Sequence, residues 1–298
     1  RDRTSVEWET HLLSGAFIAG SHPSHPSPLI CEMETSTGCP RYVAGGCSFC
    51  IEPSRGPVRF RYPADVISEI EELCRHGVEN IRIGGQSDLI SYMSGDVGRL
   101  EVPEPDPGPL GELMIGARTA LHEGAGVRRA IGAGRRLQID TGILHTDNSN
   151  PAVIAEYPES SKKALELIRD GCTPGSVLAL GLESSDPGVR VRNNLNSTGE
   201  QTFEAVRIMN EVGKEYGQNG LPRLLPGINF LSGLPGQSAD SFSMDLKLLD
   251  DILSSGLMVR RINIRKAIFH DRSKETNCGA EMSRAFRKFK ERVRTHHD

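Results

Sequence analysis

Short apolar stretches alternate with helical patterns along most of this chain. The apolar stretches predict strands at residues 29–34, 80–83, 137–140, 176–182, 227–231 and 261–268. Residues 63–77 illustrate the helical pattern, with apolar positions spaced by three and four between an opening proline and a closing glycine. Further helices are expected at 110–123, at 152–170 in two pieces parted near Pro158, at 200–216, at 242–253 and over the last 20 residues. Strands that alternate with helices predict an α/β fold with parallel strands and right-handed crossovers.

The unusual residues of the sequence follow the ends of expected strands, and this position helps to choose between two α/β architectures. They are a cysteine-rich loop at 39–50, Gly84-Gly85-Gln86, the segment 145–150, Glu183-Ser184 and the glycines at 233 and 236. Parallel units either close into a barrel or form a doubly wound sheet. One rim of a barrel collects the loops that follow its strands into a single site, which favours the barrel. Six units are too few for the common eight-stranded barrel.

Length and charge describe an ordinary globular protein of 298 residues with a net charge of -4. No stretch reaches the roughly 18 apolar residues of a membrane span, and no signal peptide is visible, so a reducing cytoplasm is expected. We divide the chain into an N-terminal extension (1–28), a barrel (29–269) and a basic, helical C-terminal extension (270–298). The chain begins at Arg1 and ends in a charged helical pattern, which suggests a fragment of a longer protein.

The loop after the first expected strand holds Cys39, Cys47 and Cys50, three of the seven cysteines, within twelve residues. Thiolate sulfur is a soft ligand that suits zinc or iron–sulfur clusters. Gly45 and Gly46 make the loop flexible enough to bring Cys39 towards the other two. Three thiolates around a four-iron cluster leave one iron without a protein ligand, and an open position is what a catalytic metal site keeps for its substrate.

Two other interpretations of this cysteine loop remain open at this point. A structural zinc site can use the same three cysteines but needs a fourth ligand, and no second Cys-x-x-Cys or His pair follows nearby. The chain would then be a non-catalytic zinc or iron–sulfur module in an RNA-processing or electron-transfer assembly. A disulfide framework is disfavoured, because the remaining cysteines are scattered and are best explained as small buried side chains.

The spacing Cys-x7-Cys-x-Phe-Cys resembles a widened form of the three-cysteine motif of the radical SAM superfamily, which usually reads Cys-x3-Cys-x-aromatic-Cys. The resemblance implies an open, partial (β/α)6 TIM-like barrel that binds a [4Fe–4S] cluster and S-adenosylmethionine (SAM). It also implies reductive cleavage of SAM to a 5′-deoxyadenosyl radical, with an electron from a donor such as ferredoxin or flavodoxin. The chain resembles in particular an uncharacterised archaeal-type group that carries a C-terminal helix-hairpin-helix, a module that is not visible here.

Further motifs resemble SAM-binding elements of this superfamily, and each also has a plainer interpretation. Gly84-Gly85-Gln86 resembles its Gly-Gly-Glu element, with an amide in place of the acid, but is also a simple turn. Glu183-Ser184 resembles the position that reaches the ribose or methionyl moiety, and Arg192 can pair with a carboxylate, unless it is merely solvated. Apolar residues at 227–236 resemble those that flank adenine. The resulting cofactor-binding residues are Phe49, Gly84, Gly85, Glu183, Ser184, Arg192, Phe230 and Leu231, with Cys39, Cys47 and Cys50 as cluster ligands.

The substrate is not readable from these motifs, but two features are candidates for contacting it. His145, Asp147 and Asn148 follow the third expected strand and can contact a substrate, transfer protons or cap the next helix. Residues 260–298 carry twelve Lys or Arg against five Asp or Glu, with Phe286 and Phe289 interleaved. Such a segment can bind RNA, or it can form a solvated basic helix that covers the end of the barrel.

Overall fold

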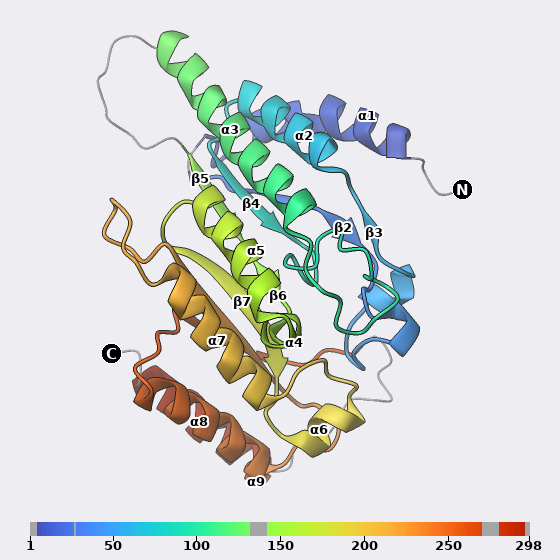
Figure 1. Cartoon of the computed structure of the whole chain (residues 1–298), viewed down its shortest axis with the longest axis vertical. Helices are drawn as coiled ribbons and strands as arrows, with labels where there is room; N and C mark the ends of the chain where they lie inside the picture. Colours follow the sequence, from blue (N-terminus) through green and yellow to red (C-terminus); the bar gives the residue numbers. More distant parts are fainter. Residues whose placement is uncertain (1–4, 27, 132–141, 270–279, 296–298) are drawn as a thin grey trace.

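Two parallel sheets form an arc of strands at the centre of the molecule (Figure 1). The computed structural model describes residues 5–26, 28–131, 142–269 and 280–295. One sheet has the order β1-β4-β5 and the other the order β6-β7-β8-β9. The strands are β1 (Cys31–Glu34), β4 (Asn80–Gly84), β5 (Ile143–Thr146), β6 (Asn148–Ser149), β7 (Ser176–Glu183), β8 (Leu224–Ser232) and β9 (Arg261–Lys266). The sheets meet at Asp147, between β5 and β6, and the expectation of an open, partial barrel is confirmed.

Helices cover the outer face of this arc in the order of the sequence (Figure 1). Six of them pack each against the next: α2 (Pro63–Arg75), α3 (Pro107–Ile131), α5 (Pro158–Gly171), α7 (Gly199–Gly213), α8 (Ala239–Ser254) and α9 (Ala280–Thr295). The others are α1 (Ser5–Gly15), which packs on α2, and the short helices α4 (Pro151–Glu156) and α6 (Pro187–Arg192). None of the helices in the described ranges is long and apolar enough to cross a membrane.

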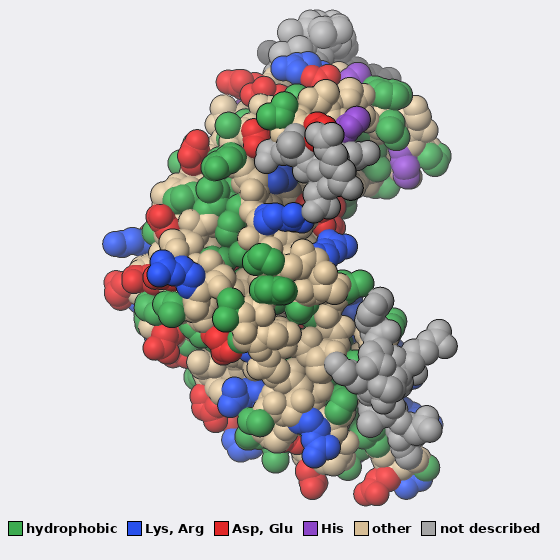
Figure 2. Space-filling model, turned by 90° about the vertical axis from the view of Figure 1, so that its right-hand side faces the viewer, with side chains coloured by type: hydrophobic (Ala, Val, Ile, Leu, Met, Phe, Trp, Pro, Cys, Tyr) green, Lys and Arg blue, Asp and Glu red, His purple; other side chains and the backbone are tan. Residues whose placement is uncertain are grey.

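The core lies between these helices and the outer face of the sheets. Alternation along the strands places Ile81, Ile83 and Ile228 in it, each without exposed surface. Burying each such side chain contributes roughly 1.5–3 kcal/mol relative to leaving it exposed. The residues between them, such as Arg82 and Asn229, are only half-buried and face the inside of the arc, which is hollowed in Figure 2.

The third strand of the described chain differs from the sequence expectation. The strand expected at 137–140 lies outside the described residues, and the structure has β5 and β6 where a loop was expected at 145–150. Leu144 and Thr146 are buried on the outer face, whereas His145 points to the other side. Two short strands that the sequence analysis missed, β2 (Ser36–Thr37) and β3 (Arg59–Phe60), pair antiparallel on either side of the cysteine loop.

The C-terminal helix α9 packs on the barrel through its aromatic side chains. Phe289 is 1% exposed, with its ring 5.4 Å from that of Phe230 and 5.8 Å from that of Phe242. Phe286 lies 5.5 Å from Phe242. Phe289 therefore belongs to the core and Phe286 packs against it, which favours the alternative of a basic helix that covers the end of the barrel over aromatics interleaved on an RNA-binding surface. The basic side chains of α9 lie mostly on its solvent-exposed face.

Candidate functional site

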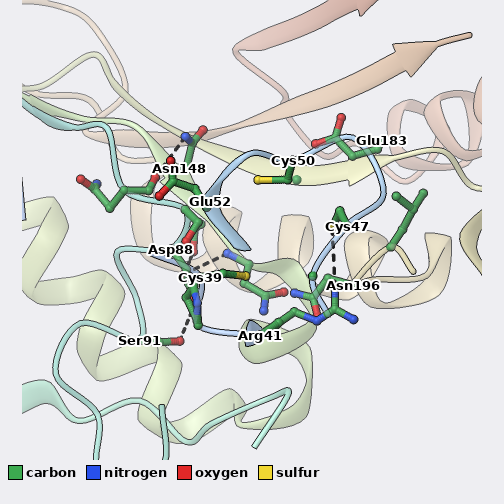
Figure 3. Close-up of a pocket in the computed structure, with 18 of the residues that line it drawn as sticks. Cys39, Arg41, Cys47, Cys50, Glu52, Asp88, Ser91, Asn148, Glu183 and Asn196 are labelled. Carbon is green, nitrogen blue, oxygen red and sulfur yellow. Dashed lines mark hydrogen bonds between the residues drawn. The ribbon is translucent and has the colours of Figure 1, made fainter. Parts of the chain in front are cut away.

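A cavity of about 300 Å³ lies where the loops after several parallel strands converge (Figure 3). Cys39, Cys47 and Cys50 line it from the loop after β1, and Gly85 follows β4. Glu183 comes from the end of β7 on the same cavity. The carboxyl ends of parallel strands thus bring together segments that are far apart in the sequence, as the rim of a barrel does.

The three thiols are close enough to influence one another. Burial raises the pKa of all three, that of Cys47 to about 12, and the charge of Cys50 raises the pKa values of Cys39 and Cys47 further. For Cys50 the additional rise comes from the charges of Glu52 and Glu183. A bound metal reverses this effect, because its positive charge deprotonates a coordinating thiol. Within the described ranges no three His, Cys, Asp or Glu side chains are placed to hold a single metal ion. A cluster, by contrast, distributes its thiolates over several iron ions, so these residues fit a cluster better than zinc.

The wide gap between Cys39 and Cys47 forms a compact turn. Residues Tyr42–Ala44 make one turn of 3₁₀-helix, and Gly45 ends it with a φ of +85°. Gly46 follows with a φ of +64°. Glycine adopts this left-handed conformation without the steric cost that a Cβ brings. The seven residues between the first two cysteines therefore fold back on themselves, and the first thiol returns to the other two.

Hydrogen bonds fasten this loop to the segment after α6. The backbone N–H and the hydroxyl of Ser48 donate to the backbone and side-chain oxygens of Asn193, at 3.0 and 2.8 Å. The side-chain amide of Asn194 donates to the carbonyls of Ala44 and Gly46, at 2.7 and 2.8 Å. Asn194 has a φ of +50°, a conformation that asparagine tolerates better than most residues. The position of the cysteines is thus set by contacts with a distant part of the chain.

Glu183 is placed in the cavity by an irregularity at the end of β7. The register with β8 shifts between Gly181 and Glu183, and Glu183 has a φ of +69°. Burial raises the pKa of its carboxyl group to about 8, against a smaller opposing effect of Arg265. Glu183 lines the same cavity as Cys47 and Cys50, and in its ionised form it raises their pKa values. At pH 7 the carboxyl group is therefore mostly protonated and can both donate and accept hydrogen bonds.

The other predicted cofactor residues divide into those at the cavity and those away from it. Phe49 lines the cavity and packs with Leu231 against a small apolar cluster around Leu234. Gly84 is buried behind Gly85, where a Cβ would lie 2.8 Å from the Glu32 carboxyl carbon. Leu231 itself does not line the cavity.

Phe230, Ser184 and Arg192 lie outside the cavity lining. Phe230 is on the opposite face of β8, in the core against Phe289, so its assignment to the cofactor site is corrected. Ser184 is 1% exposed and its hydroxyl accepts a hydrogen bond from the N–H of Asp186. Arg192 is exposed at the end of α6. Side chains alternate between the two faces of a strand, which explains why Phe230 faces the core whereas its neighbours on β8 face the other way.

Sequence reasoning missed the polar residues around Asp88. This buried carboxylate accepts hydrogen bonds from the N–H groups of Ile90 and Asn150, at 3.2 and 3.0 Å, and from the Ser91 hydroxyl at 2.5 Å. Burial raises its pKa, and these hydrogen bonds oppose the rise. This hydrogen-bond network joins the loop after β4 to β6. The sequence does not reveal it, because a single aspartate four residues after a strand matches no recognisable motif.

Of the three candidates for substrate contact, only Asn148 lines the cavity. Its side-chain amide donates to the Gln86 carbonyl at 3.2 Å. Asp147 instead forms ion pairs with Arg82 and Arg261, at 2.5 and 3.2 Å, on the inner side of the arc. Burial and the charge of Arg82 lower the pKa of His145 in the same region.

The chain is similar to proteins of known sequence and structure. The model of the radical SAM superfamily matches residues 33–249. An uncharacterised protein of Methanocaldococcus jannaschii, MJ0274, is 39% identical over 99% of this chain, and the chain spans 52% of that protein. A tRNA-2-methylthio-N(6)-dimethylallyladenosine synthase of Xylella fastidiosa is 26% identical over 76% of this chain and 39% of its own length. Coproporphyrinogen III oxidase from Escherichia coli matches the fold with a TM-score of 0.55, at 14% identity, over 95% of this chain and 56% of that one.

Proposed function

Because this chain belongs to the radical SAM superfamily, we propose that it is the core of an enzyme whose cavity holds a [4Fe–4S] cluster and SAM. The observation that supports this most directly is the convergence of Cys39, Cys47 and Cys50 on one cavity. When bound, the reduced cluster supplies the single electron that splits SAM into methionine and a 5′-deoxyadenosyl radical. The electron comes from a donor protein such as a ferredoxin or flavodoxin.

The residues of the cavity support specific roles around these cofactors. The three thiols would hold three irons of a bound cluster, and since the described lining holds no fourth cysteine, the remaining iron would be left for SAM. Phe49, backed by Leu231, offers an apolar wall for an adenine ring. Gly85 lets the backbone approach a ligand closely, and the protonated Glu183 can hydrogen-bond to hydroxyl groups.

Anaerobic reconstitution with iron and sulfide tests this function. We expect about four irons and four sulfides per chain, a brown protein, and 5′-deoxyadenosine formed from SAM after reduction with dithionite. Changing Cys39, Cys47 or Cys50 singly to Ala is expected to abolish the visible absorption of the cluster. Cys172→Ala is the matched control, because this buried thiol lies outside the cavity. A colourless protein that binds zinc without sulfide would contradict the proposal.

For the substrate, we propose RNA. The X. fastidiosa relative is named as a tRNA-modifying synthase, although this chain spans only 39% of it. The solvent-exposed face of α9 carries Arg284, Arg287, Lys288, Arg292 and Arg294, and basic groups bind phosphates with release of counterions. The inner face of the barrel is hollowed (Figure 2), a shape that suits a large substrate.

A further inference from the structure

Arg41 lies two residues after Cys39, within the gap that widens the cysteine motif. Its side chain is only 8% exposed and lines the cavity. One guanidinium nitrogen, Nη1, donates to the sulfur of Cys47 at 3.5 Å (Figure 3). The same nitrogen donates to the backbone carbonyl of Asn194 at 2.8 Å. The other, Nη2, donates to the side-chain oxygen of Asn194 at 3.2 Å. The cation is thus fixed beside a thiol that the proposed function assigns to the cluster.

The surroundings of Arg41 leave most of its charge uncompensated. Asn194 is neutral, so its two hydrogen bonds hold the guanidinium without cancelling its charge. Among the described residues, the one carboxylate paired with it is that of Glu101, at 3.6 Å, and this side chain is 55% exposed. An exposed partner is screened by water and contributes little. Arginine also stays protonated in proteins, so the positive charge beside Cys47 is permanent.

We propose that Arg41 is a positioning residue that holds the Cys47 thiolate through an N–H···S hydrogen bond and raises the reduction potential of the bound cluster. Uptake of an electron makes the cluster and its thiolates more negative, and a poorly screened cation favours that state. Hydrogen bonds to the sulfurs and net charge are known determinants of cluster potentials. A low-potential donor protein therefore reduces the cluster more easily than it would without Arg41. This inference rests on the proposed function, because it requires Cys47 to be a ligand.

The competing explanation is that Arg41 only clamps the loop. Asn194 binds Ala44, Gly46 and Arg41 together, so the loss of either Arg41 or Asn194 would loosen the same turn. The two explanations differ in what they predict for the potential. A clamp affects how much cluster assembles and how long it lasts, whereas a charge beside the sulfur affects the potential of every cluster that has assembled.

The test is a redox titration of the reconstituted cluster. The electron paramagnetic resonance signal of the reduced cluster monitors the titration. For Arg41→Gln we expect the ratio of reduced to oxidised cluster at the wild-type midpoint to fall about tenfold, which is a shift of about 59 mV to more negative potential for one electron. Arg41→Lys keeps the charge and is expected to restore most of this loss. Iron and sulfide contents are measured on the same samples, so that potentials are compared only between filled sites.

Two control variants separate charge from clamping. Asn194→Gly keeps the left-handed backbone and the charge of Arg41 but removes the clamp, so it is expected to lower cluster yield without moving the potential. Glu101→Gln removes a carboxylate that is exposed and screened, so it is expected to move the potential in the positive direction and by much less than Arg41→Gln moves it in the negative direction. An unchanged potential in a fully loaded Arg41→Gln variant, or equal shifts in Arg41→Gln and Asn194→Gly, would overturn the inference.

The design also covers failure of the main variant. If Arg41→Gln assembles no cluster, the neutral variant Arg41→Met takes its place: a shift to more negative potential supports the inference, and an unchanged potential overturns it. If Arg41→Gln instead weakens SAM binding at an unchanged potential, Arg41 is a SAM ligand and the inference is wrong. A wild-type chain that binds no cluster at all would refute the proposed function itself, which is a distinct outcome.

Discussion

Gly46 and Cys39 lie so close together that a Cβ at position 46 would be 3.3 Å from the Cys39 sulfur. The same Cβ would lie only 2.3 Å from the ring of Pro53. The neighbouring Gly45 is different, because a Cβ there would meet nothing within 4 Å. Both glycines have a positive φ, but only at Gly46 do the neighbouring atoms also leave no room for a side chain. The two positions therefore separate backbone strain from crowding at the cysteine loop.

We expect Gly46→Ala to abolish or strongly reduce assembly of the cluster, because Pro53 and Cys39 must both move to accommodate the methyl group. Gly45→Ala is the control, since it adds only the strain of a left-handed alanine, roughly 1–2 kcal/mol. The measurement is iron and sulfide per chain with the visible absorption after reconstitution. Equal cluster contents in the two variants would contradict the crowded arrangement of the loop.

A second pair of glycines tests the loop after β4. Gly85 lines the cavity with a φ of +76°, and a Cβ there would lie 2.6 Å from the Glu34 side chain. We expect Gly85→Val to weaken SAM binding at least tenfold while the iron content stays intact, because the backbone that lines the cavity must shift to relieve the contact with Glu34, whereas the thiols lie on another loop. Equilibrium binding of SAM to the reconstituted protein measures this.

The control for this variant is Gly98→Val. Gly98 has a similar φ of +80°, but it does not line the cavity and a Cβ there would have its nearest neighbour 3.9 Å away. The Gly98→Val substitution therefore imposes comparable backbone strain, but away from the cavity. If both variants bind SAM equally, or if Gly85→Val binds as the wild type does, Gly85 is not part of the SAM site.

The sequence predicted local features of this site well and long-range ones poorly. The spacing of Cys39, Cys47 and Cys50 is local, so their convergence could be inferred from the loop alone. Phe230 was assigned to the wrong face of β8, because an apolar stretch does not reveal which of its alternating side chains face the core. The contact between Arg41 and Asn194 joins residues 153 positions apart and depends on how α6 packs, which no sequence pattern encodes.

Asp245 gives the molecule a pH-dependent stability. This residue of α8 has no exposed surface, and one carboxylate oxygen accepts a 2.6 Å hydrogen bond from the N–H of Ser185. The other oxygen has no hydrogen-bond partner within the described ranges. Burial raises the pKa of Asp245 from 3.8 to about 7, against the opposing effect of hydrogen bonding from Ser185 and with a smaller contribution from the charge of Asp186. The folded protein therefore prefers the protonated form.

We expect this carboxyl group to destabilise the fold as the pH rises. Below pH 4 it is protonated in both the folded and the unfolded state and has no effect. Between pH 4 and 7 it ionises in the unfolded state first, so the free energy of unfolding falls, by on the order of 4 kcal/mol in all, and then stays constant. Asp245→Asn should remove this dependence.

Urea unfolding at pH 5 and pH 8 measures the effect. The stability of Asp245→Asn relative to the wild type is expected to be higher at pH 8 than at pH 5, whatever the effect of the amide itself. Asp240→Asn is the control, because Asp240 is exposed on the first turn of the same helix. A stability difference between Asp245→Asn and the wild type that does not change with pH would show that the carboxyl group is not held in its neutral form.

The basic face of α9 leads to the last prediction, which concerns RNA. Arg287 and Lys288 are exposed, and Lys290 lies over the ring of Phe286 with its ammonium 5.6 Å from the ring centre. If these groups contact phosphates, binding of transfer RNA falls steeply as salt rises, with a slope of about -0.7 per contact for single-stranded segments. Changing all three to Ala should weaken binding at low salt and reduce the magnitude of this slope by roughly two.

The control must change the net charge by the same amount elsewhere. Arg99, Lys163 and Lys214 are exposed and lie outside α9, so their triple change to Ala matches the charge and leaves this helix intact. Phe289 and Phe286 stay in place in both variants, which keeps the packing of α9 on the barrel. Equal losses in the two triple variants would mean that RNA responds only to net charge. Binding of the wild type that does not depend on salt would argue against phosphate contacts altogether and favour a small-molecule or peptide substrate.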